Sequence, residues 1–582
     1  MRNSIKTVIS QAKNPEITRA CDKTTGFGTS SNIRFLLCLL LCFFSIGFLF
    51  AQETTPEKSG QGSPLDGGRK IFPLPEQREP RPNTDIHAEL TVVFSKDLEA
   101  PEMDFRKSYY ASEAQIYTAL YEGLFSYEPL TLSPVMAAAE SWQLSDDKKV
   151  WTFTIRQNAR YWNGDPLRAE DFRAAWLSML DPKTEAPYSS LFDIIEGAKD
   201  YRLGNNTDPS SVGIIAEGDK TLIVRLNAPA SFFPSMLCHH SFSPIHPSML
   251  RNGNWTAPVS NGPFYITRET AKTIELAKNK FYWDADNVSL NEITIYFSDD
   301  GEESADMWNS GESRWIAGNV ELEALSNTNG IVFNPMFATH YYYIRSIGPW
   351  KDYRLRRALS LALPWKEMRD VYFLPSKTLI FPISGYPEIA GIEEGNMEEA
   401  EKLLEDAGFP KGVGLPEIVI RVTPSEDDDR IAKLMAGAWM KLGIPVKLDI
   451  VPFGRYFNSL KEEDYNIGSI TWIGDFADPY TFLQMWRRDS NLNDAFHNDN
   501  DFEEMMERSM YSDGLERFAI LAEAEQLLLD RGAVLPLCYS PALNIIDTDE
   551  IDGWFPNAMD IHPFKYLQFK ALKPLPGVAS KP

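Results

Sequence analysis

Hydrophobic and polar positions alternate with two different periods along most of the chain, which predicts strands mixed with helices. In VWTFTIR at 150–156 and TLIVRL at 221–226, apolar residues occupy every second position, which is the spacing of a half-buried strand. Further strands are predicted at 87–94 and as a pair around 273–297. Residues 109–125 instead place apolar side chains three or four positions apart, which predicts a helix. The mixture favours an α/β or α+β architecture.

The clearest unit is a strand, a helix and a second strand between residues 417 and 451. EIVIRV at 417–422 and PVKLDIV at 445–451 are typical of strands, and residues 429–442 gather apolar side chains on one helical face. Gly443 suits the left-handed conformation that ends many helices. Because such crossovers are right-handed and join parallel strands, we expect the two strands to be parallel.

Another strand, GSITWIG at 468–474, leads directly into a polar loop that contains Asp475. Asp478 and Pro479 then carry the signals of a helix start, with Asp478 as the cap and Pro479 in the first turn. Asp475 is therefore expected at the carboxyl end of a strand, where open α/β sheets place their ligand crevices. On these residues alone, the simpler role for Asp475 is to stabilise the start of that helix.

The amino-terminal part of the chain has the pattern of a targeting segment. FLLCLLLCFFSIGFLF at 35–50 contains no charge and follows a basic region. A basic region, an apolar run and a small residue, here Ala51, predict a secretory signal in residues 1–51, with an uncleaved membrane anchor as the alternative. Residues 52–84 are rich in proline and glycine, so we expect a disordered tether.

The net charge is −25, from 82 acidic against 57 basic residues, and this disfavours a nucleic-acid-binding function. Beyond residue 51 only Cys238 and Cys538 remain, which excludes a disulfide framework. The two cysteines form either one bond or two buried free thiols, and the sequence does not decide between them.

Motifs for hydrolytic or metal chemistry are absent from the sequence. There is no G-x-S-x-G, no H-E-x-x-H and no P-loop, and no cofactor is expected. His239 and His240 are adjacent, with His246 nearby, but neighbouring side chains of an extended segment point to opposite faces and chelate poorly. We therefore expect no metal site. Glycoside hydrolases use a pair of carboxylates, but in so acidic a chain such pairs arise by chance. Without the distance between the carboxylates, their presence does not indicate this activity.

Residues 121–192 resemble the oligopeptide-binding proteins of ABC importers, the family-5 solute-binding proteins. The resemblance rests on YEGLF at 121–125, AAESWQLSDDKKVWTFTIRQNARYWNGDPLRAEDFRAAW at 138–176 and DPKTEAPYSSLF at 181–192. Further matches follow in the family's order: PVSNGPFYI at 258–266, NKFYWDADNVSLNEITIYF at 279–297, YYYIRS at 341–346, DYRLRRALSLAL at 352–363 and ITWIGDFADPYTFL at 470–483. The resemblance extends over about 85–575.

The resemblance implies a two-lobed α/β fold of the periplasmic-binding-protein type, with an extra small domain and a ligand cleft between the lobes. By the family's layout, lobe I combines 85–125, 247–340 and 535–575, the small domain is 126–246, lobe II is 341–534 and 576–582 is a tail. The chain would cross between the lobes near 341 and near 535, and these crossings would form the hinge of a closing cleft.

The resemblance also implies a ligand site. Family members bind an extended peptide through main-chain hydrogen bonds, as an added strand would be bound. Asp475 matches the aspartate that holds the peptide's α-amino group, because a buried ammonium requires an anion. The other residues expected beside the ligand are Trp472, Ile473, Tyr188, Tyr109, Tyr110 and Ala111. Two departures from the family pattern are the bulk of Tyr109 and Tyr110 and an isoleucine, Ile295, where an aromatic cleft residue is common.

The function implied is that of an extracytoplasmic receptor that captures oligopeptides, passes them to the permease subunits of an ABC transporter and catalyses no reaction. We expect a monomer in the periplasm or outside the cytoplasmic membrane, with membrane contact only through an uncleaved amino-terminal segment. The alternatives are the same fold with another ligand, such as a sugar, a nickel complex or an opine, a secreted hydrolase, and a chaperone or adhesin. Arg354, Arg356 and Arg357 are candidates for a peptide carboxylate, although a solvated helix face is the simpler interpretation.

Overall fold

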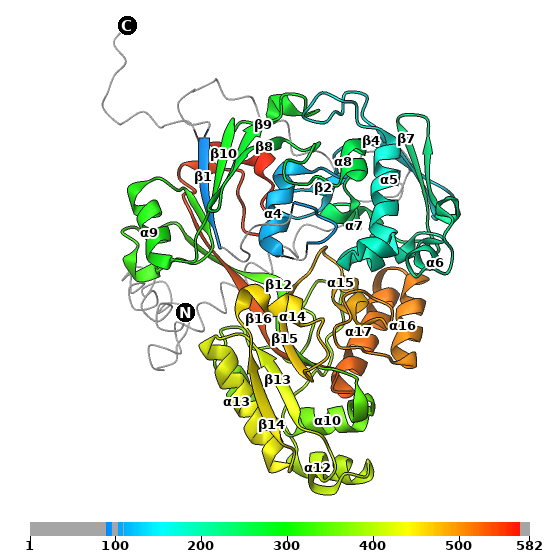
Figure 1. Cartoon of the computed structure of the whole chain (residues 1–582), viewed down its shortest axis with the longest axis vertical. Helices are drawn as coiled ribbons and strands as arrows, with labels where there is room; N and C mark the ends of the chain where they lie inside the picture. The colour runs from blue at the N-terminus through cyan, green and yellow to red at the C-terminus, as the bar shows by residue number, and fades with distance from the viewer. Residues whose placement is uncertain (1–88, 96–102, 109, 571–582) are drawn as a thin grey trace, which may run out of the picture.

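A ten-stranded mixed sheet runs through the whole molecule in the computed structural model, which describes residues 89–95, 103–108 and 110–570 (Figure 1). Its strands, in spatial order, are β14 (Val446–Ile450), β13 (Ile418–Val422), β15 (Ile467–Ile473), β12 (Ile331–Ile344), β16 (Val534–Ile546), β11 (Trp315–Ala317), β1 (Glu89–Phe94), β10 (Glu292–Phe297), β9 (Thr273–Lys278) and β8 (Phe264–Glu269). This mixed α/β arrangement confirms the expected fold class.

Two long antiparallel strands, β12 and β16, connect the two lobes of the molecule. We call the part that carries β1 and β8–β11 the first lobe, and the part that carries β13–β15 the second lobe. The pairing of β12 with β16 is interrupted between Pro335 and Thr339 and again between His340 and Tyr341. The strands that join the lobes are therefore irregular where they pass from one lobe to the other. Bulges disrupt the hydrogen bonds between paired strands and bend the strands locally.

The second lobe contains the predicted crossover. Strands β13 and β14 are parallel and are joined by helix α13 (Glu426–Lys441), and Gly443 follows it with a φ of 83°. The helix begins three residues earlier than the pattern indicated, because Ser425 accepts a hydrogen bond from the Asp428 N–H and four acidic residues suit the positive end of the helix.

A second sheet of four antiparallel strands forms a separate unit beside the first lobe (Figure 1). Its spatial order is β4 (Ala139–Leu144), β5 (Val150–Ile155), β7 (Thr221–Arg225) and β6 (Ile214–Glu217). We call residues 139–225 the four-stranded unit. Two small sheets pair β2 (Phe125–Tyr127) with β3 (Pro134–Met136) and β17 (Ile551–Asp552) with β18 (Gln568–Phe569). The boundaries of the three-domain layout remain predictions.

Helices cover the sheets and close the ends of the lobes. Besides α13 they are α4 (Ala111–Leu120), α5 (Ala169–Leu180), α6 (Ala198–Arg202), α7 (Phe233–Met236), α8 (Pro247–Asn252), α9 (Gly301–Ser310), α10 (Tyr353–Leu361), α11 (Trp365–Arg369), α12 (Met397–Asp406), α14 (Phe453–Ser459), α15 (Tyr480–Leu483), α16 (Asn500–Met510) and α17 (Gly514–Asp530).

The helix predicted at 109–125 is wrong in its length, since α4 ends at Leu120. Tyr121 is already extended, and Glu122 exchanges two hydrogen bonds with the side chain of Asn261. This contact with a distant loop draws the chain out of the helix and into β2. A helical pattern of apolar residues gives no information about such a contact.

Cys238 and Cys538 are free thiols, so the structure does not contain the bond that the sequence left open. The predicted signal or anchor in 1–51 and the predicted tether in 52–84 lie outside the described residues. Among the helices of the described ranges, none has the length and apolar character needed to span a membrane.

Candidate functional site

A cavity of about 430 Å³ lies between the lobes and takes its walls from segments far apart in the sequence. The first lobe contributes residues of α4 and of the segment that follows it, and the four-stranded unit contributes Tyr188. The second lobe contributes the run 469–475, together with residues of α13 and α14. The volume lies within the range that small-molecule and peptide sites commonly have.

Strand β15 presents a free edge to this cavity. Its neighbour β13 pairs with it only through Ile420 and Ile467, whereas β12 pairs with it along its whole length. The Ser469 N–H points away from β12, because it donates to the hydroxyl of Tyr456 at 2.8 Å. Since strand amides alternate in direction, the amides of Thr471 and Ile473 face the same side, and the described chain offers them no strand there.

Asp475 lies where this free edge ends. It is 8% exposed and lines the cavity. Thr481, in α15, donates a 2.9 Å hydrogen bond to its Oδ2, and Tyr188 also hydrogen-bonds the carboxyl group. Burial raises the pKa of Asp475 to about 7, and these hydrogen bonds only partly oppose the effect. The residue therefore both supports the start of α15 and supplies a poorly solvated carboxylate to the cavity.

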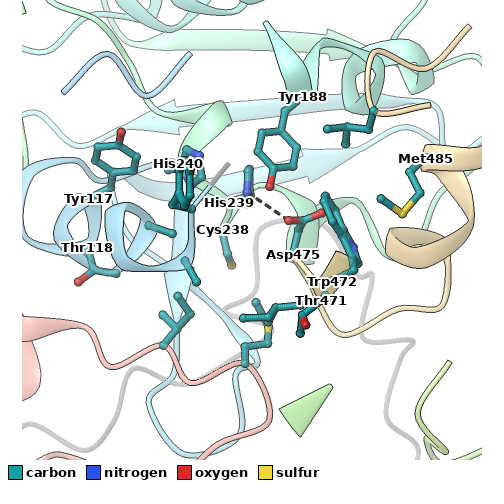
Figure 2. A pocket seen from close by; sticks show the side chains of 18 of the residues that line it. Tyr117, Thr118, Tyr188, Cys238, His239, His240, Thr471, Trp472, Asp475 and Met485 are labelled. Atoms are coloured by element: carbon teal, nitrogen blue, oxygen red, sulfur yellow. Dashed lines mark ion pairs between the residues drawn. The ribbon is translucent and has the colours of Figure 1, made fainter. Parts of the chain in front are cut away.

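Tyr188 and two histidines surround this carboxylate from the opposite wall (Figure 2). Nε2 of His239 lies 3.7 Å from Oδ1 of Asp475, and the His239 ring lies 4.7 Å from the ring of Tyr188. Burial lowers the pKa of His239 to about 3 and that of His240 well below its ordinary value. Both imidazoles are therefore neutral near pH 7 and leave the charge of Asp475 uncompensated.

The expectation that His239 and His240 point to opposite faces is wrong. Their rings lie 4.0 Å apart, because the chain turns there into a short 3-10 helix at 240–242 instead of remaining extended. The closeness of the two rings does not by itself make a metal site. Among the described residues, no group of three or more histidine, cysteine or acidic side chains is arranged to hold a metal ion.

Most of the other site residues predicted from the sequence also line the cavity. Trp472, Ile473, Tyr110 and Ala111 all contribute to its wall, whereas Tyr109 lies outside the described residues. Gly474 allows the strand to end against Phe337, since a Cβ there would fall 2.4 Å from a ring carbon. The indole Nε1 of Trp472 is buried and has no hydrogen-bond partner in the described chain.

Two ion pairs of the wall were missed from the sequence. Nζ of Lys565 lies 2.8 Å from Glu122, and Nζ of Lys461 lies 2.8 Å from Asp494. Glu122 is part of the YEGLF motif, which drew attention to the segment but gave no role for this residue. Glu122 and Lys565 are several hundred residues apart, and Asp494 lies in a loop without a recognisable motif. A local sequence pattern therefore does not predict either pair.

The departure at Ile295 and the three arginine candidates lie away from the cavity. Ile295 is fully buried in β10 and does not line the cavity. Arg354 pairs with Asp352 and Arg357 with Glu399. Arg356 corrects the expectation of a solvated face, because it is 3% exposed and donates to the carbonyl groups of Trp350 and Lys351. None of these arginines is part of the cavity wall.

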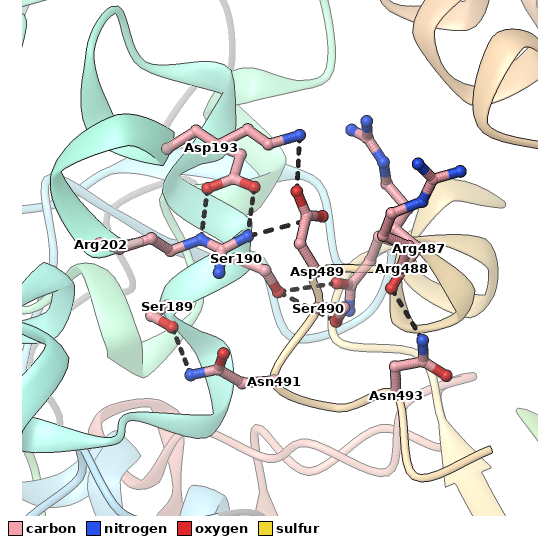
Figure 3. A network of polar contacts seen from close by, with 12 residues as sticks. Ser189, Ser190, Asp193, Arg202, Arg487, Arg488, Asp489, Ser490, Asn491 and Asn493 are labelled. Atoms are coloured by element: carbon pink, nitrogen blue, oxygen red, sulfur yellow. Dashed lines mark hydrogen bonds and ion pairs between the residues drawn. The ribbon is translucent and has the colours of Figure 1, made fainter. Parts of the chain in front are cut away.

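A polar network joins the four-stranded unit to the second lobe outside the cavity (Figure 3). Asp489 of the second lobe lies 2.7 Å from Nζ of Lys199 and 3.8 Å from Arg202. Asn491 donates to the hydroxyl of Ser189, and the hydroxyls of Ser190 and Ser490 lie 3.2 Å apart. We call this set of contacts the latch, and its side chains are those of Ser189, Ser190, Lys199, Arg202, Asp489, Ser490 and Asn491. It holds the two walls of the cavity together.

Comparisons with known proteins agree with this architecture. Residues 133–494 match the family described as bacterial extracellular solute-binding proteins, family 5 middle. The chain is 28% identical over 435 residues to the oligopeptide-binding protein OppA of Bacillus subtilis, which covers 70% of this chain and 79% of that protein. It is 27% identical over 482 residues to the periplasmic oligopeptide-binding protein OppA of Salmonella typhimurium, covering 77% of this chain and 87% of the relative.

Among solved structures, the Haemophilus influenzae OppA complex with RPPGFSPFR is similar, with a TM-score of 0.72 and 24% identity. The match covers 83% of this chain and 99% of the other. At this identity the comparison establishes the fold.

Proposed function

Because the chain belongs to the bacterial extracellular solute-binding proteins of family 5, we propose that it captures oligopeptides in extended form for an ABC importer. Its family and curated relatives are binding proteins, and the two relatives named above are described as oligopeptide-binding. The proposal is that this chain binds peptides reversibly and catalyses no reaction.

The free edge of β15 is the observation that carries the proposal. A peptide in extended form satisfies its amides by pairing with a strand, and pairing of this kind does not depend on the peptide's sequence. Here the amides of Thr471 and Ile473 face a cavity without a strand partner, and Tyr456 occupies the edge at Ser469. The edge therefore offers room for a short stretch of peptide that ends toward Asp475.

Asp475 would hold the α-amino group of that peptide. Its carboxylate is buried, has no lysine or arginine partner in the described chain, and lies among neutral imidazoles. An ammonium group supplies the missing positive charge and hydrogen-bond donors in one group. This support is electrostatic and depends on the unpaired state of Asp475.

Closure of the lobes would exclude water from the pair. The irregular stretches of β12 and β16 are suited to act as the hinge, and the latch and the wall residues of the cavity meet only when the lobes are together. We propose that the protein opens at this hinge to admit and release its ligand.

The setting follows from the relatives, several of which are described as periplasmic. We propose that the chain acts outside the cytoplasmic membrane as a monomer and presents its closed form to the permease subunits of an ABC transporter. The apolar segment at 35–50 would direct export or anchor the chain.

Isothermal titration calorimetry with paired peptides tests the proposal. Free-amine tripeptides should bind the parent protein, and their N-acetylated counterparts should bind about 30- to 5,000-fold more weakly, since losing one partner of a buried charge pair costs about 2–5 kcal/mol. Asp475→Asn should weaken the free peptides by a similar factor and the acetylated peptides little. Equal binding of free and acetylated peptides would contradict the role of Asp475.

A control and a screen complete the experiment. Asp478→Asn is unsuitable as a control, because Arg517 donates to Asp478 and both are buried. Asp427→Asn is suitable, because Asp427 is exposed and is not part of the cavity wall. If no peptide binds, mass spectrometry of molecules that copurify with the protein would identify another solute, and the peptide proposal would fail.

A further inference from the structure

The cavity wall contains a second carboxylate, Asp428, whose position resembles that of Asp475 in one respect: it is buried and faces the cavity. Asp428 lies in the first turn of α13, is 8% exposed and lines the cavity together with Thr423. The hydroxyl of Tyr342 donates to its Oδ1 at 3.1 Å, and the hydroxyl of Thr423 donates to its Oδ2. A carboxylate accepts about four hydrogen bonds, so Asp428 retains accepting capacity toward the cavity.

The charges of the wall do not balance. Its carboxylates are those of Glu122, Asp428, Asp475 and Asp494, and its ammonium groups are those of Lys461 and Lys565. The two lysines are paired with Asp494 and Glu122 at 2.8 Å each. No lysine or arginine of the described ranges forms an ion pair with either remaining carboxylate. The wall thus lacks two positive charges, and one ligand amino group supplies only one of them.

His340 does not supply the second charge near neutral pH. Its Nε2 lies 4.0 Å from Oδ1 of Asp428, and its Nδ1 lies 3.0 Å from the hydroxyl of Thr471. Burial lowers the pKa of His340 below its ordinary value, although Asp428 and then Asp427 act in the opposite direction. The imidazole is therefore largely neutral at pH 7, and it lies between Asp428 and Thr471 of the free edge of β15.

We propose that Asp428 binds a basic side chain of the ligand and makes the cavity selective for peptides with lysine or arginine close to their amino end. The inference rests on the proposed function and specifies its substrate class. Thr471 precedes Asp475 by four residues, which corresponds to roughly 13 Å along a strand. An extended peptide whose amino group is at Asp475 therefore brings its fourth or fifth residue to the level of Thr471.

Strand geometry adds a restriction to this selectivity. Side chains of an extended peptide alternate between the two faces of the sheet that it joins. One face of β15 carries Trp472, whereas Thr471 and His340 lie on the other, toward Asp428. A lysine can therefore reach Asp428 from alternate peptide positions, and a lysine at the position between them points to the Trp472 side.

A lysine scan by calorimetry tests the inference. The probes are five-residue peptide amides of alanine with one lysine at position three, four or five, each matched by a peptide with norleucine, which has a similar length and no charge. We expect lysine to be preferred by about 10- to 100-fold at one position or at two alternate positions, as for a charge-assisted hydrogen bond. Asp428→Asn should abolish the preference, and Asp427→Asn, in the same helical turn but exposed, should retain it.

The outcomes separate the two proposals. If none of the peptides binds, the proposed function fails. If the peptides bind but lysine and norleucine are equivalent, if lysine is preferred equally at neighbouring positions, or if the preference survives in Asp428→Asn, the role of Asp428 is overturned. Should Asp428→Asn not fold, as judged by circular dichroism, the parent protein still decides, because Nε-acetylation of the lysine must abolish the preference.

Discussion

The hydroxyl of Tyr127 donates a 3.0 Å hydrogen bond to the main-chain carbonyl of Asp475. Tyr127 ends β2, beside α4 and the four-stranded unit, whereas Asp475 follows β15 of the second lobe. The bond therefore joins two walls of the cavity and holds the loop that carries the proposed amine anchor.

Tyr127→Phe should weaken peptide binding by about 2- to 10-fold, because it removes one neutral hydrogen bond that, in the proposed closure, forms when the lobes come together. The lost interaction is structural and not ionic, so the ratio between free and acetylated peptides should stay the same. Calorimetry measures both quantities. A variant that loses this ratio would indicate that Tyr127 acts on the carboxylate itself.

The affinity for free-amine peptides should depend on pH through Asp475. With a pKa of about 7 in the unliganded protein, Asp475 is ionised above pH 7 and protonated below it. The ammonium group requires the ionised form, so the Kd should rise by about tenfold per pH unit below 7, and should rise again above about pH 8 as the peptide amine deprotonates. Titrations between pH 5 and 9 check this profile. In Asp475→Asn the acidic limb should be absent, and a flat profile in the parent protein would contradict the pKa argument.

The same carboxyl group should limit the stability of the unliganded protein. Its pKa is about 7 in the folded chain and 3.8 ordinarily, so the folded state holds an extra proton between these values and loses stability as pH rises from about 4 to 7. Above pH 7, Asp475→Asn should be more stable than the parent by roughly 2–4 kcal/mol, with little difference near pH 4. Urea unfolding at both pH values measures this, and a destabilised variant at pH 8 would refute it.

The latch should control how long a ligand stays bound. Asp489→Asn removes the partner of Lys199 and Arg202 across the interface, so the closed form should open more readily. We expect the dissociation rate to rise by about 3- to 10-fold, with a smaller change in association. Stopped-flow fluorescence measures both rates. Asp501→Asn, which removes a carboxylate that pairs with Arg531 within the second lobe, is the matched control and should leave the dissociation rate unchanged.

The sequence predicted the local elements of the second lobe well. The crossover at 417–451 depends on near-neighbour patterns, such as the apolar face of α13 and Gly443 after it, and the structure confirms its parallel strands. Asp475 was correctly placed at the end of a strand for the same reason. Patterns of this kind report burial and turns within a segment.

The rest of the site depends on contacts between distant segments. Glu122 meets Lys565, and Tyr127 meets Asp475, at separations of several hundred residues. The edge of β15 is free because β13 pairs with β15 only at Ile467. No residue pattern within β15 predicts where its neighbour stops pairing. In the sequence, Asp428 is one of four acidic residues at the start of a helix, and nothing there separates it from Asp427. Only the structure shows that Asp428 is buried against the cavity.

A crystal structure of the protein with a free-amine tripeptide tests the central claim most directly. The account predicts an extended peptide in the cavity, with its ammonium nitrogen about 2.7–2.9 Å from the Asp475 carboxylate and its main chain hydrogen-bonded to Thr471 and Ile473. A peptide bound outside this cavity, or bound inside it with its amino group away from Asp475 and the edge of β15 unpaired, would contradict the account.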